Sequence, residues 1–165
     1  MMSAPTATLT LMGKEDDDID LYSEITLNLW QGGTGQYETT YQGQKRLPAM
    51  NDPKPFDVVV SLNSYALPVG WLVKELRFGF ADGPLTPEII EEIEHVAEWA
   101  YLEWKKGRRV LVRCEAGLNR SSLVIGLILM QDGMSAKEVI ALIHKQRSHH
   151  ALSNKEFKNH LLGWG

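Results

Sequence analysis

Hydrophobic and polar side chains alternate over several short stretches in the first half of the chain, which is the pattern of β-strands. Residues 24–31 alternate with Ile25, Leu27 and Leu29 as the apolar set, which predicts a half-buried strand ending at Gly32-Gly33. The segment 56–62, FDVVVSL, is apolar without alternation and predicts a strand at the centre of a sheet, covered on both faces. A third strand is predicted over residues 75–80.

The period changes to that of a helix after residue 86. Thr86 is a suitable N-cap, Pro87 suits the first helical position, and apolar residues then recur at helical spacing until Gly107. A short strand is predicted over residues 110–112, and it delivers the chain to Cys114. This stretch therefore reads as helix, turn and strand.

Three further helices are predicted in the last third of the chain. Residues 121–131 are apolar nearly all round, which indicates a helix buried in the middle of the domain. Two capping boxes then predict two helix starts. Their residue pairs are Ser135 with Glu138 and Ser153 with Glu156.

The order of these elements predicts the fold class. Strands that alternate with helices indicate an α/β domain with a central, mainly parallel (mixed) sheet of four to five strands, flanked by helices. Residues 1–20 are expected to form a flexible or loosely packed arm, and residues 21–165 a single domain. Residues 34–55 show neither period, so they are expected to form a long loop, either functional or a surface excursion.

Composition narrows the functional classes. A net charge of −4 counts against DNA as a partner. The longest apolar run, residues 123–130, is too short to cross a bilayer, and the N-terminus lacks a secretory signal. We expect a cytoplasmic protein with no membrane partner. The single cysteine cannot form an internal disulfide, and a reducing compartment would keep its thiol available.

That cysteine opens the segment with the most chemical content, CEAGLNRS at residues 114–121. A thiol with a reference pKa near 8.5 needs an environment that stabilises its anion before it becomes a nucleophile. Here a strand leads into Cys114, a tight loop with Gly117 follows, and a helix begins near Arg120. Inward-pointing N–H groups and the helix N-terminus would stabilise a thiolate, and the same cradle would bind a phosphate dianion.

The residues around this loop predict a complete catalytic set. Arg120 offers a planar fork for two phosphate oxygens, and Ser121 can donate a hydrogen bond to the sulfur as it leaves. Attack on a phosphate monoester also needs a proton donor. Asp82 lies at the end of a predicted strand in a Gly/Pro loop, where it could be that donor or simply a turn-forming residue.

The chain resembles the dual-specificity phosphatase group of the cysteine-based protein tyrosine phosphatase superfamily. The likeness runs over about residues 24–164 and is strongest at 110–130, VLVRCEAGLNRSSLVIGLILM. A second match, ALSNKEF at 151–157, is similar to the Pro-Asn-x-x-Phe region of small members. The late position of the motif separates the chain from low-molecular-weight phosphatases.

The resemblance implies a two-step reaction within a dual-specificity-phosphatase-like catalytic domain. Cys114 would attack the phosphoryl group while Asp82 protonates the leaving oxygen, and water would then hydrolyse the phosphocysteine with Asp82 as base and Ser121 assisting the sulfur. No metal or organic cofactor is implied. The substrate would be a phosphorylated protein or peptide, and the chain would act as a monomer that also binds phosphate-like anions. The implied phosphate-binding residues are Glu115, Ala116, Gly117, Leu118, Asn119 and Arg120.

One position departs from the family pattern, because Arg113 stands where these phosphatases usually have histidine before the cysteine. That histidine orders the loop, and arginine also donates hydrogen bonds, so it could substitute. The departure motivates a reading in which the domain binds phosphorylated partners without turnover. Asn119 motivates another, since Gly-x-Asn-Arg also occurs in RNA 5′-triphosphatases. Inositol phosphates remain a further alternative, although the loop lacks lysines.

Three other patterns are interpreted as structural. The histidines near the C-terminus fit no standard zinc spacing. The segment Gly32-Gly33-Thr34-Gly35 lacks the ending of a nucleotide-binding loop and is interpreted as a turn. Trp99 and Trp104 are expected to pack against the core.

Overall fold

A five-stranded sheet forms the centre of the computed structural model, which describes residues 8–9, 19–34, 56–69 and 72–164. Only the first pair of strands is antiparallel, so the predicted mainly parallel α/β fold is confirmed. The strands lie in the order β3 (Tyr22–Thr26), β4 (Leu29–Gly33), β7 (Val110–Cys114), β5 (Val58–Ser61) and β6 (Lys74–Arg77).

Two of these strands match the predicted positions with shorter bounds. The strand expected over residues 56–62 is β5, which is buried along its whole length but lies beside the middle strand, β7. The strand expected over 75–80 is β6, which ends at Arg77. A separate pair, β1 (Thr8–Leu9) and β2 (Ile19–Asp20), lies within the segment expected to form the arm. The division of the chain at residue 20 stays a prediction, and residues 35–55 of the expected loop lie outside the described chain.

The single strand expected over residues 24–31 is wrong. The segment is a hairpin, in which β3 and β4 pair across a turn at Leu27 and Asn28. Asn28 has a φ of 66°, and Leu27 is 75 % exposed. An apolar residue at the turn kept the alternation in phase, which made two strands resemble one. Gly32-Gly33, interpreted as a turn, instead lie within β4, where they pair with the last two residues of β7.

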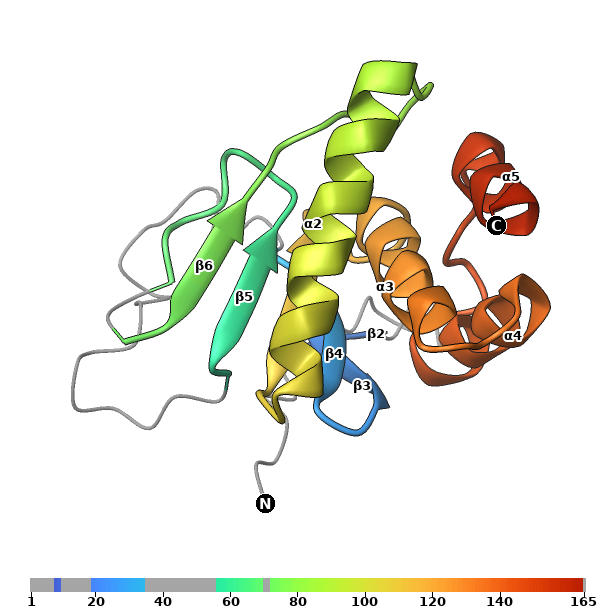
Figure 1. Cartoon of the computed structure of the whole chain (residues 1–165). Helices are drawn as coiled ribbons and strands as arrows, with labels where there is room; N and C mark the ends of the chain where they lie inside the picture. The colour runs from blue at the N-terminus through green and yellow to red at the C-terminus, as the bar shows by residue number, and fades with distance from the viewer. Residues whose placement is uncertain (1–7, 10–18, 35–55, 70–71, 165) are drawn as a thin grey trace.

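The structure describes four helices (Figure 1): α2 (Pro87–Lys105), α3 (Arg120–Gln131), α4 (Ala136–Gln146) and α5 (Lys155–Gly163). Helices α2, α3 and α4 pack on strands of the sheet, and α5 packs on α3 and α4. The predicted Thr86 cap and the capping box of Ser135 with Glu138 are confirmed. The predicted box of Ser153 with Glu156 is wrong. Asn154 caps α5, because its side-chain oxygen accepts from the backbone N–H groups of Glu156 and Phe157.

The inner strands bury side chains on both faces, as the apolar run predicted. Val58 and Val60 pack into the large core that the helices share, whereas Val59 joins a smaller cluster with Trp30 and Phe56. Helix α3 is buried from Ser121 to Leu129, which confirms its predicted place in the middle of the domain. Trp99 and Trp104 pack against the large core, as expected.

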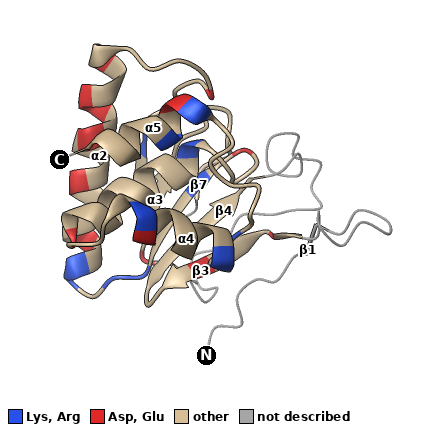
Figure 2. Ribbon diagram, turned by 90° about the vertical axis from the view of Figure 1, so that its right-hand side faces the viewer, with Lys and Arg blue, Asp and Glu red and all other residues tan. Residues whose placement is uncertain are grey.

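Acidic side chains gather along helix α2, as Figure 2 shows, and they include the exposed Glu88, Glu91, Glu92 and Glu98. This face contributes to the negative net charge of −4. None of the helices in the described ranges combines the length and the apolar character that crossing a bilayer requires.

Candidate active site

The carboxyl ends of β4, β7 and β5 meet at one edge of the sheet, because these strands run parallel. Ligands of α/β sheets bind outside this edge. Strand β7 ends at Cys114, the loop 115–119 follows, and α3 starts at Arg120. The thiol of Cys114 is 2 % exposed, and its Sγ lies 3.4 Å from Ser121 Oγ, within hydrogen-bond range for sulfur.

The carbonyl groups of the loop all have partners in the body of the protein. Thr34 N–H donates to the carbonyls of Cys114 and Glu115. The guanidinium of Arg147 donates to the carbonyls of Ala116 and Gly117. The carbonyl of Leu118 accepts from Leu152 N–H and from Ser122 Oγ.

These carbonyl contacts fix the direction of the N–H groups. In a trans peptide the N–H of the next residue points opposite to the C=O, and the chain has no cis bonds. The five carbonyls of residues 114–118 are held by the protein body, so the N–H groups of residues 115–119 point the other way, toward the space above the loop. N–H groups that converge in this way would form an anion cradle of the kind that the sequence motif predicts.

Two glycines allow the loop to lie this close to the sheet. Gly117 has a φ of 71°, and a Cβ there would lie 2.6 Å from the backbone carbon of Gly32. A Cβ on Gly33 would lie 2.7 Å from the carbonyl oxygen of Glu115. The strand position of Gly32-Gly33 is therefore needed for the loop, which the sequence pattern alone did not reveal.

Helix α3 leaves its N-terminus available to a ligand. Asn119 occupies the N-cap position but makes no capping hydrogen bond with its side chain, and the first turn carries no acidic residue. The N–H groups of that turn and the helix dipole then favour an anion. Arg120 starts the helix, and its Nη1 donates to the carbonyl of Phe80 at 3.0 Å. This contact ties the guanidinium to the segment that leads to Asp82.

Asp82 lies beside this cradle, held by two amide side chains. Asn119 Nδ2 donates to Asp82 Oδ2 at 3.0 Å, and Asn154 Nδ2 donates to Asp82 Oδ1 at 2.8 Å. Asn119 Oδ1 also accepts from the backbone N–H of Asn154 at 3.0 Å. The carboxylate is exposed but oriented, and the start of α5 is connected to the phosphate loop through it.

A buried glutamine on β4 is a member of the site that the sequence reasoning missed. Gln31 is 0 % exposed, and its Nε2 lies 3.1 Å from Ser121 Oγ and 2.7 Å from Ser122 Oγ. It also donates to the carbonyl of Gly117 at 3.2 Å. The available signal was one polar residue in a strand otherwise buried by apolar packing. Because the sequence predicts a half-buried strand there, in which polar residues are common, Gln31 did not stand out.

Arg147, after the last turn of α4, was also missed. It is 7 % exposed, and besides the loop carbonyls it donates to Asp20 O at 2.5 Å and to Ser23 Oγ at 2.9 Å. Burial lowers the pKa of Arg147 to about 10, while Coulomb interactions with Cys114 and Asp20 oppose that shift. A positive charge therefore lies beneath the phosphate loop, within electrostatic range of the sulfur.

Arg113, which replaces the usual histidine, extends to the opposite face of the sheet from Cys114, because successive side chains of a strand alternate. It is 2 % exposed, and its Nε donates to Ser61 Oγ at 2.9 Å. Its Nη2 donates to Leu67 O at 2.7 Å and lies 3.6 Å from Glu75 Oε2. The arginine thus fixes the segment that follows β5, at the same edge of the sheet as the cysteine.

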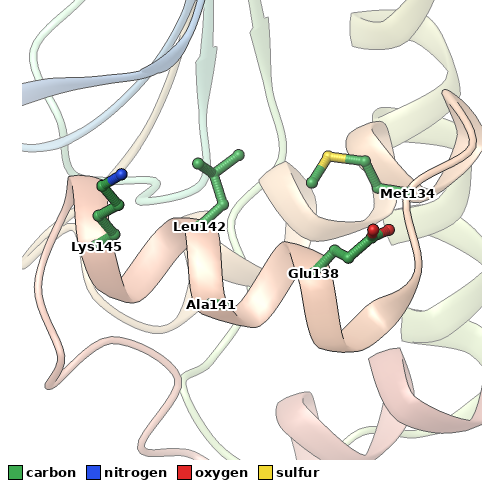
Figure 3. Close-up of a pocket in the computed structure, with 5 residues that line it drawn as sticks. All are labelled: Met134, Glu138, Ala141, Leu142 and Lys145. Carbon is green, nitrogen blue, oxygen red and sulfur yellow. The ribbon is translucent and has the colours of Figure 1, made fainter.

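A hollow of about 410 Å³ lies elsewhere, on helix α4. Figure 3 shows Leu142 and Lys145 on the same side of that helix. Its lining includes Met134 and Glu138 but no residue of the phosphate loop, so it is not the site of the chemistry. In the described part of the chain, no group of three or more histidine, cysteine and carboxylate side chains could hold a metal ion.

The structure brings the predicted residues together at one edge of the sheet: Cys114 and Ser121 in contact, Arg120 at the loop end, and Asp82 beside Asn119. Their catalytic roles stay predictions. The side chains that connect them were not foreseen: Gln31, Asn154 and Arg147.

Comparison with known proteins identifies the fold and the family. Human DUSP28 superposes with a TM-score of 0.67 at 20 % identity, covering 86 % of this chain and 90 % of that one. A mouse putative dual specificity phosphatase, crystallised with zinc tungstate, gives 0.64 at 19 % identity, covering 92 % and 88 %. The human tyrosine phosphatase-like serine/threonine/tyrosine-interacting protein gives 0.59 at 20 % identity, covering 85 % and 92 %. Identities this low show a shared fold.

No curated protein sequence matches the chain significantly. A sequence model of the family described as "Dual specificity phosphatase, catalytic domain" matches residues 41–165, which include the cysteine loop and all four described helices. The chain therefore belongs to the dual specificity phosphatase family, and it is a hydrolase of the cysteine-dependent phosphatase class.

Proposed function

We propose that the chain hydrolyses phosphate monoesters on phosphotyrosine, with phosphoserine and phosphothreonine as further substrates, through a phosphocysteine formed on Cys114. The observation that carries the proposal is the direction of the loop carbonyls, which turns the N–H groups of residues 115–119 toward the space where a phosphoryl group would lie. Those N–H groups and Arg120 would bind its three oxygens.

The first step transfers the phosphoryl group to sulfur. The Cys114 thiolate attacks phosphorus, the bond from phosphorus to the ester oxygen breaks, and Asp82 gives its proton to the leaving alcohol or phenol. The amide contacts from Asn119 and Asn154 support this role, because they orient both carboxylate oxygens beside the loop.

The second step releases phosphate. Water attacks the phosphocysteine, Asp82 accepts the proton of that water, and the bond from phosphorus to sulfur breaks with the electron pair on sulfur. Ser121 Oγ, 3.4 Å from the sulfur, would donate a hydrogen bond to the departing thiolate. No step draws on a metal or an organic cofactor.

The location and partners that we propose for this enzyme depend first on its reactive thiol. A nucleophilic cysteine must stay reduced, so we propose a cytoplasmic enzyme that acts as a monomer on phosphorylated proteins and binds phosphate-like anions. Neither DNA nor a membrane is a proposed partner. A net charge of −4 and the acidic face of α2 weigh against nucleic acid.

The same observations weigh against the other readings. Asn119, which suggested an RNA 5′-triphosphatase, uses its side chain to hold Asp82, the proposed proton donor. The loop has no lysine for a highly anionic inositol phosphate. A binding module would not need an oriented carboxylate beside the loop. The fold is compatible with both classes, because one structural neighbour is a human tyrosine phosphatase-like serine/threonine/tyrosine-interacting protein.

The test compares initial rates of phosphate release from four substrates: a phosphotyrosine peptide, a phosphoserine peptide, an inositol phosphate and triphosphorylated RNA. We expect the phosphotyrosine peptide to react fastest and Cys114→Ser to lower its rate by at least about four orders of magnitude. The variant should still bind vanadate or the peptide. Normal turnover by Cys114→Ser would refute the covalent route, and faster release from RNA would favour the triphosphatase. Peptide binding without turnover by the unmodified chain would favour the binding module.

A further inference from the structure

The amide of Gln31 is buried beneath the phosphate loop, where a hydrocarbon side chain would pack at lower cost in free energy. The residue is fully buried in β4, and its strand neighbours Leu29 and Trp30 are apolar core residues. Its Oε1 is buried and accepts no hydrogen bond from the residues that the structure describes. A buried acceptor without a partner opposes folding, so stability alone does not explain this amide.

Two neighbours fix which end of the amide faces the loop. Ser122 Oγ donates its single proton to the carbonyl of Leu118 at 2.7 Å, so toward Gln31, also at 2.7 Å, it can only accept. The carbonyl of Gly117, at 3.2 Å from Nε2, can also only accept. Both require the NH₂ group of Gln31 on this side, and the orientation follows from the hydrogen-bond network.

The third neighbour of this NH₂ group is Ser121. Its Oγ lies 3.1 Å from Gln31 Nε2, which shares its two N–H protons among three acceptors. An amide NH₂ group only donates, so the Ser121 hydroxyl cannot direct its own proton toward it. Cys114 Sγ lies 3.4 Å from the same oxygen, within reach of that proton. The amide therefore biases the hydroxyl toward donating to sulfur, which is the direction that a negatively charged sulfur requires.

We propose that Gln31 is a positioning residue for the breakdown of the phosphocysteine: its amide holds the Ser121 hydroxyl in the orientation that stabilises the departing sulfur. This inference rests on the proposed function. In that step water forms the new bond to phosphorus and gives its proton to Asp82. The sulfur keeps the electron pair of the broken bond and accepts the Ser121 hydrogen bond.

A double-mutant cycle separates this role from a packing role. Gln31→Leu keeps a similar volume without any N–H, and Ser121→Ala removes the hydroxyl. Rapid-mixing kinetics with p-nitrophenyl phosphate give the burst, which reports formation of the intermediate, and the steady rate, which reports its breakdown. We expect Gln31→Leu to slow breakdown about tenfold, the size expected for one hydrogen bond to a charged group, and to change the burst less than about twofold.

The cycle makes the decisive comparison. In the Ser121→Ala background, Gln31→Leu should slow breakdown by less than about twofold, because the amide acts through the hydroxyl. Equal slowing in both backgrounds, or no slowing in either, would overturn the proposal. If Gln31→Leu does not fold, Gln31→Met takes its place, since it keeps the length of the side chain.

A readout without turnover keeps this test distinct from that of the proposed function. The rate at which iodoacetamide alkylates Cys114 near neutral pH should fall several-fold in Gln31→Leu and in Ser121→Ala, with no further fall in the double variant. Additive falls would overturn the role of Gln31. If the unmodified chain releases no p-nitrophenol while the alkylation rates follow this pattern, the proposed function fails together with the role in breakdown, and the orientation of the Ser121 hydroxyl toward the sulfur stands.

Discussion

The two edges of the sheet handle charge in different ways. At the amino edge, where β5, β6 and β7 begin, acidic and basic side chains pair with one another. Asp57 accepts three hydrogen bonds from Arg109, through the backbone N–H, Nε and Nη2. Glu103, 4 % exposed, pairs with Lys74 at 2.9 Å and also contacts Arg108.

These contacts hold charge at the amino edge in the ionised state. The side-chain hydrogen bond from Arg109 lowers the pKa of Asp57, although burial works against it. Burial tends to raise the pKa of Glu103, but the hydrogen bonds from Lys74 and Arg108 lower it below its ordinary value. Positive charge at this edge is therefore largely neutralised by carboxylates.

At the carboxyl edge, the two guanidinium groups next to the phosphate loop bind carbonyl oxygens. Arg120 donates to Phe80 O, and Arg147 donates to the carbonyls of Ala116 and Gly117. A carbonyl orients a guanidinium without cancelling its charge, so positive potential remains where the N–H groups converge. The difference between the edges is consistent with the proposed function: charge pairs at the amino edge serve folding, and the carboxyl edge would bind an anion.

Among the variants that compare the two edges, the largest loss of activity is expected from Arg120→Ala, at the carboxyl edge. We expect kcat/KM for a phosphotyrosine peptide to fall by about three orders of magnitude, with loss of vanadate binding, because the phosphoryl oxygens lose their charged donor. Arg120→Lys should recover only part, since an ammonium lacks the planar fork. The matched control at the amino edge is Arg109→Ala, which should stay within about twofold. Equal losses in the two variants would contradict the division between the edges.

Asp82→Ala is expected to come next. Its effect depends on the leaving group: hydrolysis of phenyl phosphate should slow by about 10²-fold, and that of p-nitrophenyl phosphate far less, because the activated phenol needs no proton. Steady-state rates over a series of aryl phosphates measure the difference. A uniform loss over the series would remove Asp82 from the acid role.

Asn119→Ala should have a smaller effect of the same kind. Without the hydrogen bond to Asp82 Oδ2, the carboxylate is less well oriented, so we expect about a tenfold loss for phenyl phosphate and little for activated esters. Asn159→Ala, at an exposed position of α5, is the control. If Asn119→Ala instead lost activity equally on all esters, Asn119 would act on the phosphate loop and not on the acid.

Arg113→His tests whether every arginine at the carboxyl edge serves the anion. The imidazole is too short to reach Leu67 O, so we expect the free energy of unfolding to fall by about 1–3 kcal/mol, with turnover preserved or raised. Thermal unfolding and peptide turnover measure the two effects. A collapse of turnover with unchanged stability would give Arg113 a direct catalytic function.

The smallest effect is expected from Asp57→Asn at the amino edge. Asp57 is 40 % exposed, so solvent screens the pair and the loss should be about 0.5 kcal/mol near neutral pH. The pKa of this carboxyl is lowered from 3.8, so its contribution is present above that pH and disappears as the pH falls through the lower folded value. Thermal unfolding of both proteins over this range should converge at low pH. A difference that persists in acid would contradict the charge-pair explanation.

Local sequence signals predicted the elements whose boundaries are marked by capping, proline or glycine residues. Helix α2 was foreseen with its N-cap because Thr86, Pro87 and the apolar period agree. The loop after Cys114 was foreseen because Gly117, Arg120 and Ser121 follow the cysteine at short spacing, just before α3. The hairpin at residues 22–33 was missed because Leu27, in its turn, keeps the strand alternation.

Long-range contacts set the part that could not be predicted. Gln31 and Ser121 lie 90 residues apart, and Asn154 and Asp82 lie 72 apart, so their pairing depends on how the strands and helices assemble. Asn154 also displaced the predicted Ser153 cap, since an amide one residue later reaches the helix N–H groups as well as Asp82. No local pattern reports such double use of one side chain.

The central claim is that the sulfur of Cys114 carries the phosphoryl group during turnover. Acid quenching within one turnover of a phosphotyrosine peptide, followed by peptide mass spectrometry, tests it most directly. We predict that the peptide containing Cys114 gains the mass of one phosphoryl group, that the adduct accumulates further in Ser121→Ala, and that it is absent in Cys114→Ser. Rapid turnover with no phosphoryl group on Cys114 at any quench time would contradict the account.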